Sequence, residues 1–444
     1  MSIKIEQGSE EINSTGGNIL IGALLRLRSW EKISMMTTGR IKRGEISHSD
    51  ILKIAVVLLA LGRTDFADID LYRKDPLFKE ALKLRKVPSA ETLRQRLNDL
   101  GMLNSGQTLI DSCLVELLRK VNGFGKIQTD YSSYIPLDID VSVMLNPNCK
   151  KEGVSWTYHN ENGYAPIFAY LGTHGYMLAN ELREGSQHSA KGAVEFTLRC
   201  LKLVREIGLE MENLLVRVDS GHDDKDFIKV LCLSGVKFLV KRNLRLECVE
   251  QYLALARRIG EIIPSRDGKN IYRCILSHKK PEGLENEPVF MVVEVVERLT
   301  DAKTGEDLLL PEVEVSAWWT NLPESEAVCI KLYHDHGTSE QFHSELKSDM
   351  GLERMPSGKF STNALILNVA TLAYNCLRFI GQEALNCVEL LPVKINVARR
   401  RLRSVLQDLI YIGCKFTRHA KGIIVKFGAY CPWFNVFGKV YARC

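Results

Sequence analysis

Four acidic residues stand where strands and a helix could bring carboxylates together. Asp138 and Asp140 lie two apart in an alternating apolar run, so both side chains point to one face of a predicted strand. Asp219 directly follows a second apolar run, and Glu340 lies in a charged helical stretch. Taken singly, such an aspartate is more often a turn or helix cap, and such a glutamate is usually solvated.

Carboxylates that converge from two strands and a helix repel one another unless a divalent cation neutralises them. Mg²⁺ or Mn²⁺ takes oxygen ligands of this kind. Two such ions about 3.5–4 Å apart can activate an oxygen nucleophile and stabilise the leaving oxygen in phosphodiester cleavage. The acids therefore suggest metal-dependent phosphodiester chemistry, although strand geometry does not separate Asp138 from Asp140.

The elements that must position these acids alternate, in chain order, between strands and helices. An α/β core with a mixed sheet is the fold that this order predicts. The predicted strands are 135–141, 164–171, 176–182, 214–218 and 236–241, and the predicted helices of the core are 190–207, 223–234, the Glu340 helix and 363–380. Between residues 243 and 320, apolar runs separated by charged turns indicate a strand-rich insertion.

Helical periodicity dominates the chain before the first strand. Ser89 is placed to cap a helix with Leu93 and Leu97 on one face, flanked by Arg94 and Arg96. This helix is a candidate for reading DNA, and a plain surface helix of a bundle is an equal alternative. The predicted regions are 1–125 (helical, DNA-binding), 126–242 (first part of the core), 243–321 (insertion), 322–385 (second part of the core) and 386–444 (basic segment).

Composition narrows the class of protein without naming it. The 444 residues are 45% hydrophobic and 25% charged, with a net charge of +5, which describes an ordinary globular protein that is only weakly basic. The positive charge gathers near the C-terminus and suits phosphate contact; it includes Arg399, Arg400, Arg401 and Arg403. The twelve cysteines are scattered singly, and with no secretory leader the expected location is the cytoplasm.

Two further groups of residues have alternative interpretations. His334, His336 and His343 suggest zinc, but no convincing third and fourth ligands accompany them. Trp318 and Trp319 close the insertion, and simple core packing is the favoured interpretation for both. No apolar run reaches the roughly 18–20 residues that span a bilayer.

The spacing around Glu340 resembles a known signature. Tyr333, His336, Glu340 and Lys347 form Y-x2-H-x3-E-x6-K, similar to the Y-x2-R-x3-E-x6-K of bacterial insertion-sequence transposases of the DDE class. Segments in matching order support the resemblance, which covers most of residues 20 to 385: Leu-Asp-Ile-Asp-Val-Ser (137–142), Gly-Tyr-Ala-Pro-Ile (163–167), His-Ser-Ala-Lys-Gly (188–192), Val-Arg-Val-Asp-Ser-Gly (216–221) and Phe-Leu-Val-Lys-Arg-Asn (238–243). The resemblance implies an RNase H-like core interrupted by a β-rich insertion.

Carried over residue by residue, the resemblance implies roles for the site. Asp140, Asp219 and Glu340 would be the catalytic metal ligands, with Asp138 as the fallback for the first position. Lys347 would pair with a DNA phosphate and Tyr333 would contact the terminal phosphate or a displaced base. His336 replaces the usual arginine, so its grip on phosphate should be weaker and more pH-dependent. In such transposases an insertion tryptophan can stack on a flipped base, a role open to Trp319.

The function that this implies is cut-and-paste DNA transposition. Two Mg²⁺ or Mn²⁺ ions at the acids would serve cleavage at the element ends and strand transfer into target DNA. The partners would be double-stranded DNA, namely the terminal repeats and the target, with a homodimer pairing two ends and no membrane. The alternatives are a catalytically silent DNA-binding derivative of a transposase and a metal-dependent nuclease on the same core.

Overall fold

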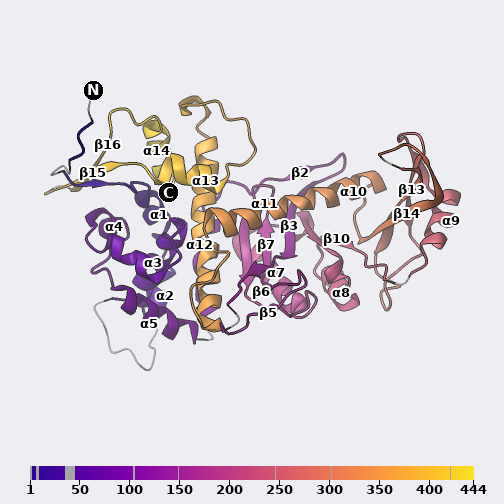
Figure 1. The fold of residues 1–444 in the computed structure, drawn as a ribbon, viewed down its shortest axis with the longest axis horizontal. Helices are drawn as coiled ribbons and strands as arrows, with labels where there is room; N and C mark the ends of the chain where they lie inside the picture. The colour runs from indigo at the N-terminus through magenta and orange to yellow at the C-terminus, as the bar shows by residue number, and fades with distance from the viewer. Residues whose placement is uncertain are drawn as a thin grey trace. The chain divides into compact units, whose positions relative to one another are not determined.

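The computed structural model describes residues 3–6, 10–35, 46–103, 106–148, 150–245, 247–301, 303–420 and 422–444 (Figure 1). The chain divides into two compact units. We call residues 1–122, 144–164 and 343–444 the helical unit, and residues 123–143 and 165–342 the sheet unit. The domain boundaries expected from the sequence stay a prediction.

The sheet unit is built on five strands with β3 (Ser133–Val141) in the middle. β9 (Leu214–Val218) pairs parallel with β3, and β10 (Lys237–Lys241) pairs parallel with β9. On the other side β7 (Ile167–Leu171) and β8 (Tyr176–Glu181) continue antiparallel. β7 and β9 are buried along their whole length, which explains why their sequences are apolar apart from Arg217 in β9. The strand order β10-β9-β3-β7-β8 confirms the predicted RNase H-like mixed sheet.

The insertion extends this sheet. β14 (Asp307–Thr320) pairs antiparallel with β10, and β13 (Phe290–Thr300), β12 (Lys269–Leu276) and β11 (Glu261–Ile263) follow in order. Helix α9 (Val249–Ile259) packs on these strands. The strand-rich character was predicted correctly, whereas hydrogen bonding to the core sheet could not be read from residue types.

Helix α10 (Glu326–His334) begins at Ser325, whose hydroxyl accepts a hydrogen bond from Val328 N. Its apolar face joins a buried cluster on the sheet that includes Leu332, Trp318 and Leu215. A 3₁₀ turn, η4 (Asp335–Thr338), and helix α11 (Ser339–Ser344) follow. In Figure 1 helices α10 and α11 belong to one orange helical stretch, and the three elements include Tyr333, His336 and Glu340.

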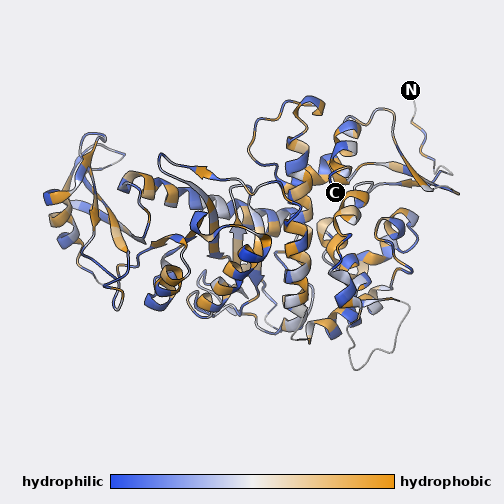
Figure 2. Ribbon diagram, turned by 180° about the vertical axis from the view of Figure 1, so that it is seen from behind, coloured by the Kyte–Doolittle hydropathy of each residue, from blue (hydrophilic) through white to orange (hydrophobic). Residues whose placement is uncertain are grey.

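The helical unit is organised around α12 (Phe360–Leu385), which packs against α3 (His48–Ala60), α5 (Ala90–Gly101) and α6 (Gly106–Leu118). Apolar residues run along the whole of this helix (Figure 2). By length and composition α12 could cross a membrane, but 89% of its most apolar window is buried inside the protein, as in a core helix. Ser89 caps α5 by accepting from Thr92 N, as the sequence predicts.

The remaining elements complete the two units. In the sheet unit they are β2 (Ile127–Gln128), α7 (Ala193–Ile207), η2 (Met211–Asn213), η3 (Ser220–His222) and α8 (Lys225–Leu233). In the helical unit they are β1 (Ile12–Asn13), α1 (Asn18–Leu24), α2 (Trp30–Ser34), η1 (Phe66–Tyr72), α4 (Pro76–Ala81), β4 (Met144–Leu145), β5 (Ser155–Trp156), β6 (Asn162–Tyr164), the π-helix η5 (Glu345–Asp349), η6 (Val388–Leu390), α13 (Leu402–Val405), η7 (Leu406–Ile410), β15 (Cys414–His419), β16 (Gly422–Phe427) and α14 (Phe434–Tyr441).

One predicted strand is divided in two. The run 164–171 is split into β6, which pairs with β4 and β5 in the helical unit, and β7 in the core sheet. Pro166 lies at the break, where it has no N–H to donate to a ladder. The chain passes between the two units at this point.

The β7–β8 turn offers a test of the sheet unit. Gly172 has φ +72°, and a Cβ there would lie 1.9 Å from the carbonyl oxygen of Phe124. Gly208, which ends α7 with φ +97°, has open space around it. Gly208→Ala should cost only the left-handed strain, roughly 1–2 kcal/mol, whereas Gly172→Ala should cost clearly more because backbone must also move. Free energies of unfolding from urea titration decide this; equal losses would contradict the predicted clash.

Candidate active site

The strand register brings Asp140 and Asp219 to neighbouring positions. β3 and β9 pair parallel from Ile135↔Leu214 to Ile139↔Val218, and the two aspartates come directly after the last pair. In the pair before Ile139↔Val218, Asp138 lies opposite Arg217, and their side chains form a hydrogen bond on one face of the sheet. Because side chains alternate along a strand, Asp140 and Asp219 point to that same face. Two carboxylates therefore stand side by side at the carboxyl edge of parallel strands, where sites form in α/β sheets.

Each of these carboxylates accepts a hydrogen bond from a nearby backbone N–H group. Asp140 Oδ1 accepts a hydrogen bond from Val141 N at 2.8 Å. Asp219 Oδ1 accepts from Gly221 N at 3.1 Å and lies 2.7 Å from Nδ1 of the buried His222. Asp219 thereby caps η3 while about half of its side chain stays exposed. Asp219 can therefore cap η3 and still offer carboxylate oxygen to a metal ion.

Beneath this pair lies a buried ion pair that the sequence did not single out. Arg217 donates from Nε and Nη2 to both oxygens of Asp138 at 2.6 and 2.8 Å, and both side chains are 2% exposed. His336 Nδ1 lies 3.0 Å from Asp138 Oδ1. Burial by itself raises the pKa of Asp138, but the charges of Arg217 and His336 outweigh it and hold that pKa below its ordinary value. The carboxylate of Asp138 is therefore committed to protein partners.

Arg217 also joins the sheet to the helix above it. Its Nη1 donates to the carbonyl oxygen of Leu332 at 2.6 Å, in the last turn of α10. The signal for this residue was a lone arginine inside the apolar strand 214–218, two residues before Asp219. Such a side chain, buried on both faces of a sheet, requires a carboxylate partner.

Tyr333 and His336 lie close enough to the acidic pair for its charge to act on both side chains. Burial and the negative charges of Asp219 and Asp140 raise the pKa of the Tyr333 phenol, so it stays protonated and can donate a hydrogen bond. His336 is 7% exposed, and its ring is tilted by 42° against that of Tyr333, with the centroids 5.8 Å apart. Burial lowers the pKa of His336, yet the charge of Asp138 and the hydrogen bond to it raise that pKa overall. The structure thus shows His336 facing Asp138; its predicted phosphate contact stays a prediction.

Glu340 lies on α11, exposed, about one helical turn after His336. Within the part of the chain that the structure describes, no three His, Cys, Asp or Glu side chains are close enough to hold a metal ion. The structure brings together Asp140, Asp219 and Tyr333, and it does not gather Glu340 with them. The paired carboxylates nonetheless fit a hard divalent cation by their chemistry, since they offer oxygen donors at adjacent strand ends.

Of the residues predicted to contact DNA, several have protein partners. Arg94 pairs with Glu91 at 2.6 Å on the exposed face of α5, whereas Arg96 donates to the carbonyl of Ile46 and contacts His48 Nδ1, both at 3.1 Å. Trp319 is 3% exposed, and its Nε1 donates a hydrogen bond to Asp223 Oδ1 at 3.1 Å. The guanidinium of Arg242 forms a cation–π contact with the Trp319 ring. DNA contact by these residues stays a prediction, and Trp319 has the packing that the sequence favoured.

The C-terminal arginines and Lys347 belong to the helical unit. Arg399 and Arg400 pair with Glu345 and Asp408, and Arg401 pairs with Asp349 at 2.9 Å. Arg403 uses its backbone N to reach Asp349 and exposes its side chain. Lys347 lies in the π-helix η5, so the regular helical spacing assumed from the sequence does not describe its direction.

The Arg217–Asp138 pair yields a stability prediction. Arg217→Met should lower the free energy of unfolding by about 3–5 kcal/mol, because it leaves a buried carboxylate without its guanidinium. Removing both charges in Arg217→Met/Asp138→Leu should recover part of that loss. Urea titration at neutral pH measures both variants, and a double variant no more stable than the single one would refute the assignment of the loss to an unpaired charge.

Comparison with known proteins places this geometry in a family. No match to a curated protein was found. Among solved structures, the chain is similar to the piggyBac transposase in its synaptic complex with hairpin DNA, with a TM-score of 0.43 and 10% identity over 89% of this chain and 80% of that chain. The family model described as "Transposase DDE domain group 1" matches residues 1–258 and 295–444. The chain therefore belongs to this family of DDE transposases, which are nucleic-acid-processing enzymes.

Proposed function

We propose that the chain is a cut-and-paste DNA transposase with Asp140, Asp219 and Glu340 as its metal ligands. The observation that carries this proposal is the parallel register of β3 and β9, which puts Asp140 beside Asp219 at the sheet edge. Asp138 is the other candidate for the first position, but its two oxygens are held by Arg217. The geometry thus favours Asp140.

The donor set suits two Mg²⁺ or Mn²⁺ ions. Asp140 and Asp219 would hold them from the sheet, and Glu340 would complete the set from α11 when the element ends are bound. Bound there, the ions lower the pKa of water and stabilise the oxygen that leaves phosphorus. A site that completes only with DNA agrees with the separation of Glu340 from the aspartates in the protein alone.

The protein's own groups have separate tasks in this reaction. In the first step a water oxygen attacks phosphorus at the element end, the P–O3′ bond breaks, and the departing O3′ takes up a proton to become a 3′-OH. In the second step that 3′-OH attacks a target phosphodiester in line, which releases a target 3′-OH. Burial and the charges of Asp219 and Asp140 keep the phenol of Tyr333 protonated, so that it would donate a hydrogen bond to the phosphate.

Lys347 and the DNA-binding regions have supporting roles in this proposal. Lys347 pairs with a phosphate near the cut, where a fixed positive charge offsets negative charge that develops during attack. The DNA substrates are the element's terminal repeats and the target duplex. A homodimer on DNA would pair the two ends.

The ligand assignment is tested on strand transfer from a pre-cut duplex that carries the DNA flanking the coding sequence. Asp219→Asn and Glu340→Gln should each lower Mg²⁺-dependent joining by more than about 100-fold, since each removes a charged oxygen ligand. Asp226→Asn, an exposed aspartate on α8, is the matched control and should retain activity. Full activity of either ligand variant refutes the site. Nicking without joining would indicate a nuclease, and binding without nicking a silent DNA-binding protein.

The choice between Asp138 and Asp140 has its own test. Asp140→Asn should abolish nicking in Mn²⁺ while leaving the urea midpoint unchanged or higher, because it removes repulsion between neighbouring carboxylates. Asp138→Asn should lower the free energy of unfolding, because Arg217 loses its counter-charge. The assignment fails if Asp140→Asn nicks DNA like the wild type.

A further inference from the structure

Both ends of the turn that carries Lys347 are held by buried carboxylates. The turn η5, Glu345–Asp349, is a π-helix, a form that is rare and often found at functional sites. Glu345 and Asp349 expose only 2% and 3% of their side chains. Lys347 lies midway, two residues from each, so contacts that fix these two carboxylates restrain the backbone on both sides of Lys347.

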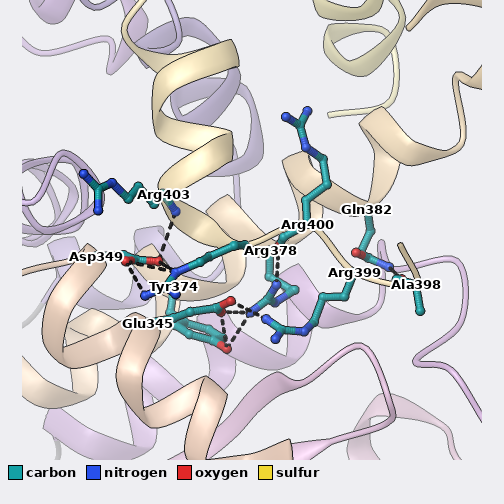
Figure 3. Close-up of polar contacts among 10 residues, drawn as sticks. Glu345, Asp349, Tyr374, Arg378, Gln382, Ala398, Arg399, Arg400 and Arg403 are labelled. Carbon is teal, nitrogen blue, oxygen red and sulfur yellow. Dashed lines mark hydrogen bonds and ion pairs between the residues drawn. The ribbon is translucent and has the colours of Figure 1, made fainter. Parts of the chain in front are cut away.

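At the first end, Glu345 faces two guanidinium groups (Figure 3). It pairs with Arg378 of α12 and with Arg399. Arg378 also donates to the hydroxyl of Tyr374 at 2.8 Å and to the carbonyl oxygen of Arg400 at 2.7 Å. Glu345, Arg378 and Tyr374 are buried, and the side chain of Arg399 is 13% exposed. Removing either guanidinium would leave the buried charge of Glu345 less well compensated, which is costly.

At the second end, Asp349 faces the same stretch of chain. Arg401 donates to Asp349 from Nε at 2.9 Å and from Nη2 at 3.1 Å, a bidentate arrangement. Arg403 N donates to Asp349 Oδ2 at 3.1 Å, as Figure 3 shows, in the first turn of α13. The segment Arg399–Arg403 therefore contacts both ends of the turn, through Arg399 at Glu345 and through Arg401 and Arg403 at Asp349.

We propose that Arg399–Arg403 is a clamp that positions Lys347 for the DNA phosphate. The contacts that form the clamp lie within the helical unit and do not depend on the proposed function. Only the DNA phosphate as the partner of Lys347 rests on that function. Arg399 and Arg401 are then positioning residues that act through Lys347. The other use of these arginines is direct contact with DNA, which the basic composition of the segment suggests.

The two uses give opposite results when Asp349 is removed. If Arg401 contacts DNA itself, Asp349→Ala releases its guanidinium, so activity is kept or raised while Arg401→Ala lowers it. If Arg401 is part of a clamp, both substitutions break the same contact and give the same loss. A clamp that acts through Lys347 further requires that neither substitution matters once Lys347 is gone.

The experiment uses the full chain, Mn²⁺ and a supercoiled plasmid bearing the DNA that flanks the coding sequence. Arg401→Ala and Asp349→Ala should each slow nicking about 10- to 100-fold, the effect of a small misplacement of a site group. In a Lys347→Ala background the same substitutions should slow it by less than twofold. Arg401→Lys, which keeps the charge but not the fork, should restore part of the rate.

The matched control is Arg73→Ala, since Arg73 pairs with Asp70 at 3.6 Å in the same unit and its side chain is 51% exposed, against 54% for Arg401. It should nick like the wild type. The clamp is overturned if Asp349→Ala keeps full activity, if Lys347→Ala is as active as the wild type, or if the losses multiply in the Lys347→Ala background.

A second readout needs neither DNA nor metal. Amide hydrogen exchange of residues 345–351 should rise at least about tenfold in Asp349→Ala, because local opening becomes easier, and should not change in Arg73→Ala. Unchanged exchange overturns the clamp whatever the nicking rates are. Full nicking by Asp219→Asn, in contrast, refutes the proposed function and leaves the exchange result to stand by itself.

Discussion

The ion pair between Arg217 and Asp138 is the contact on which the sheet unit's site depends. It joins the two central parallel strands at one register position, with both oxygens of the carboxylate and two nitrogens of the guanidinium in use. A shift of one residue between the strands would turn Arg217 away from Asp138. The same register sets Asp140 beside Asp219, so the geometry of the exposed acids follows from the buried pair.

This pair also determines where the signature helix lies. The third nitrogen of Arg217 donates to the last turn of α10, and His336 reaches the same carboxylate from η4. Tyr333 is thereby held close enough to Asp140 and Asp219 for their charges to raise the pKa of its phenol. This chain has His336 at the position where the similar transposase signature has an arginine. The side chain of His336 points inward and contacts Asp138, so the residue has a structural role at this position.

Much of the fold could be predicted because its strands are simple in sequence. β3 alternates, β9 is apolar except for Arg217, and the aspartates mark the ends of both strands. Partners at a distance could not be predicted, since residue types do not say which carboxylate meets which arginine. Arg217 therefore had no assigned role. The arginines near the C-terminus were interpreted as a phosphate-binding surface from their number alone, although Arg399, Arg400 and Arg401 each have an acidic partner.

Buried arginine–carboxylate pairs thus recur in both units, at Asp138 and at Glu345. Desolvation offsets most of the attraction in such pairs, so well-packed apolar residues would stabilise the fold at least as well. What an apolar contact lacks is direction: a guanidinium fork accepts one orientation of its carboxylate, whereas apolar side chains tolerate small slips. Metal ligands and phosphate contacts need side chains held within a fraction of an ångström. Under the proposed function, the charges buried next to Asp140 and next to Lys347 would supply that precision, which a purely stabilising role does not require.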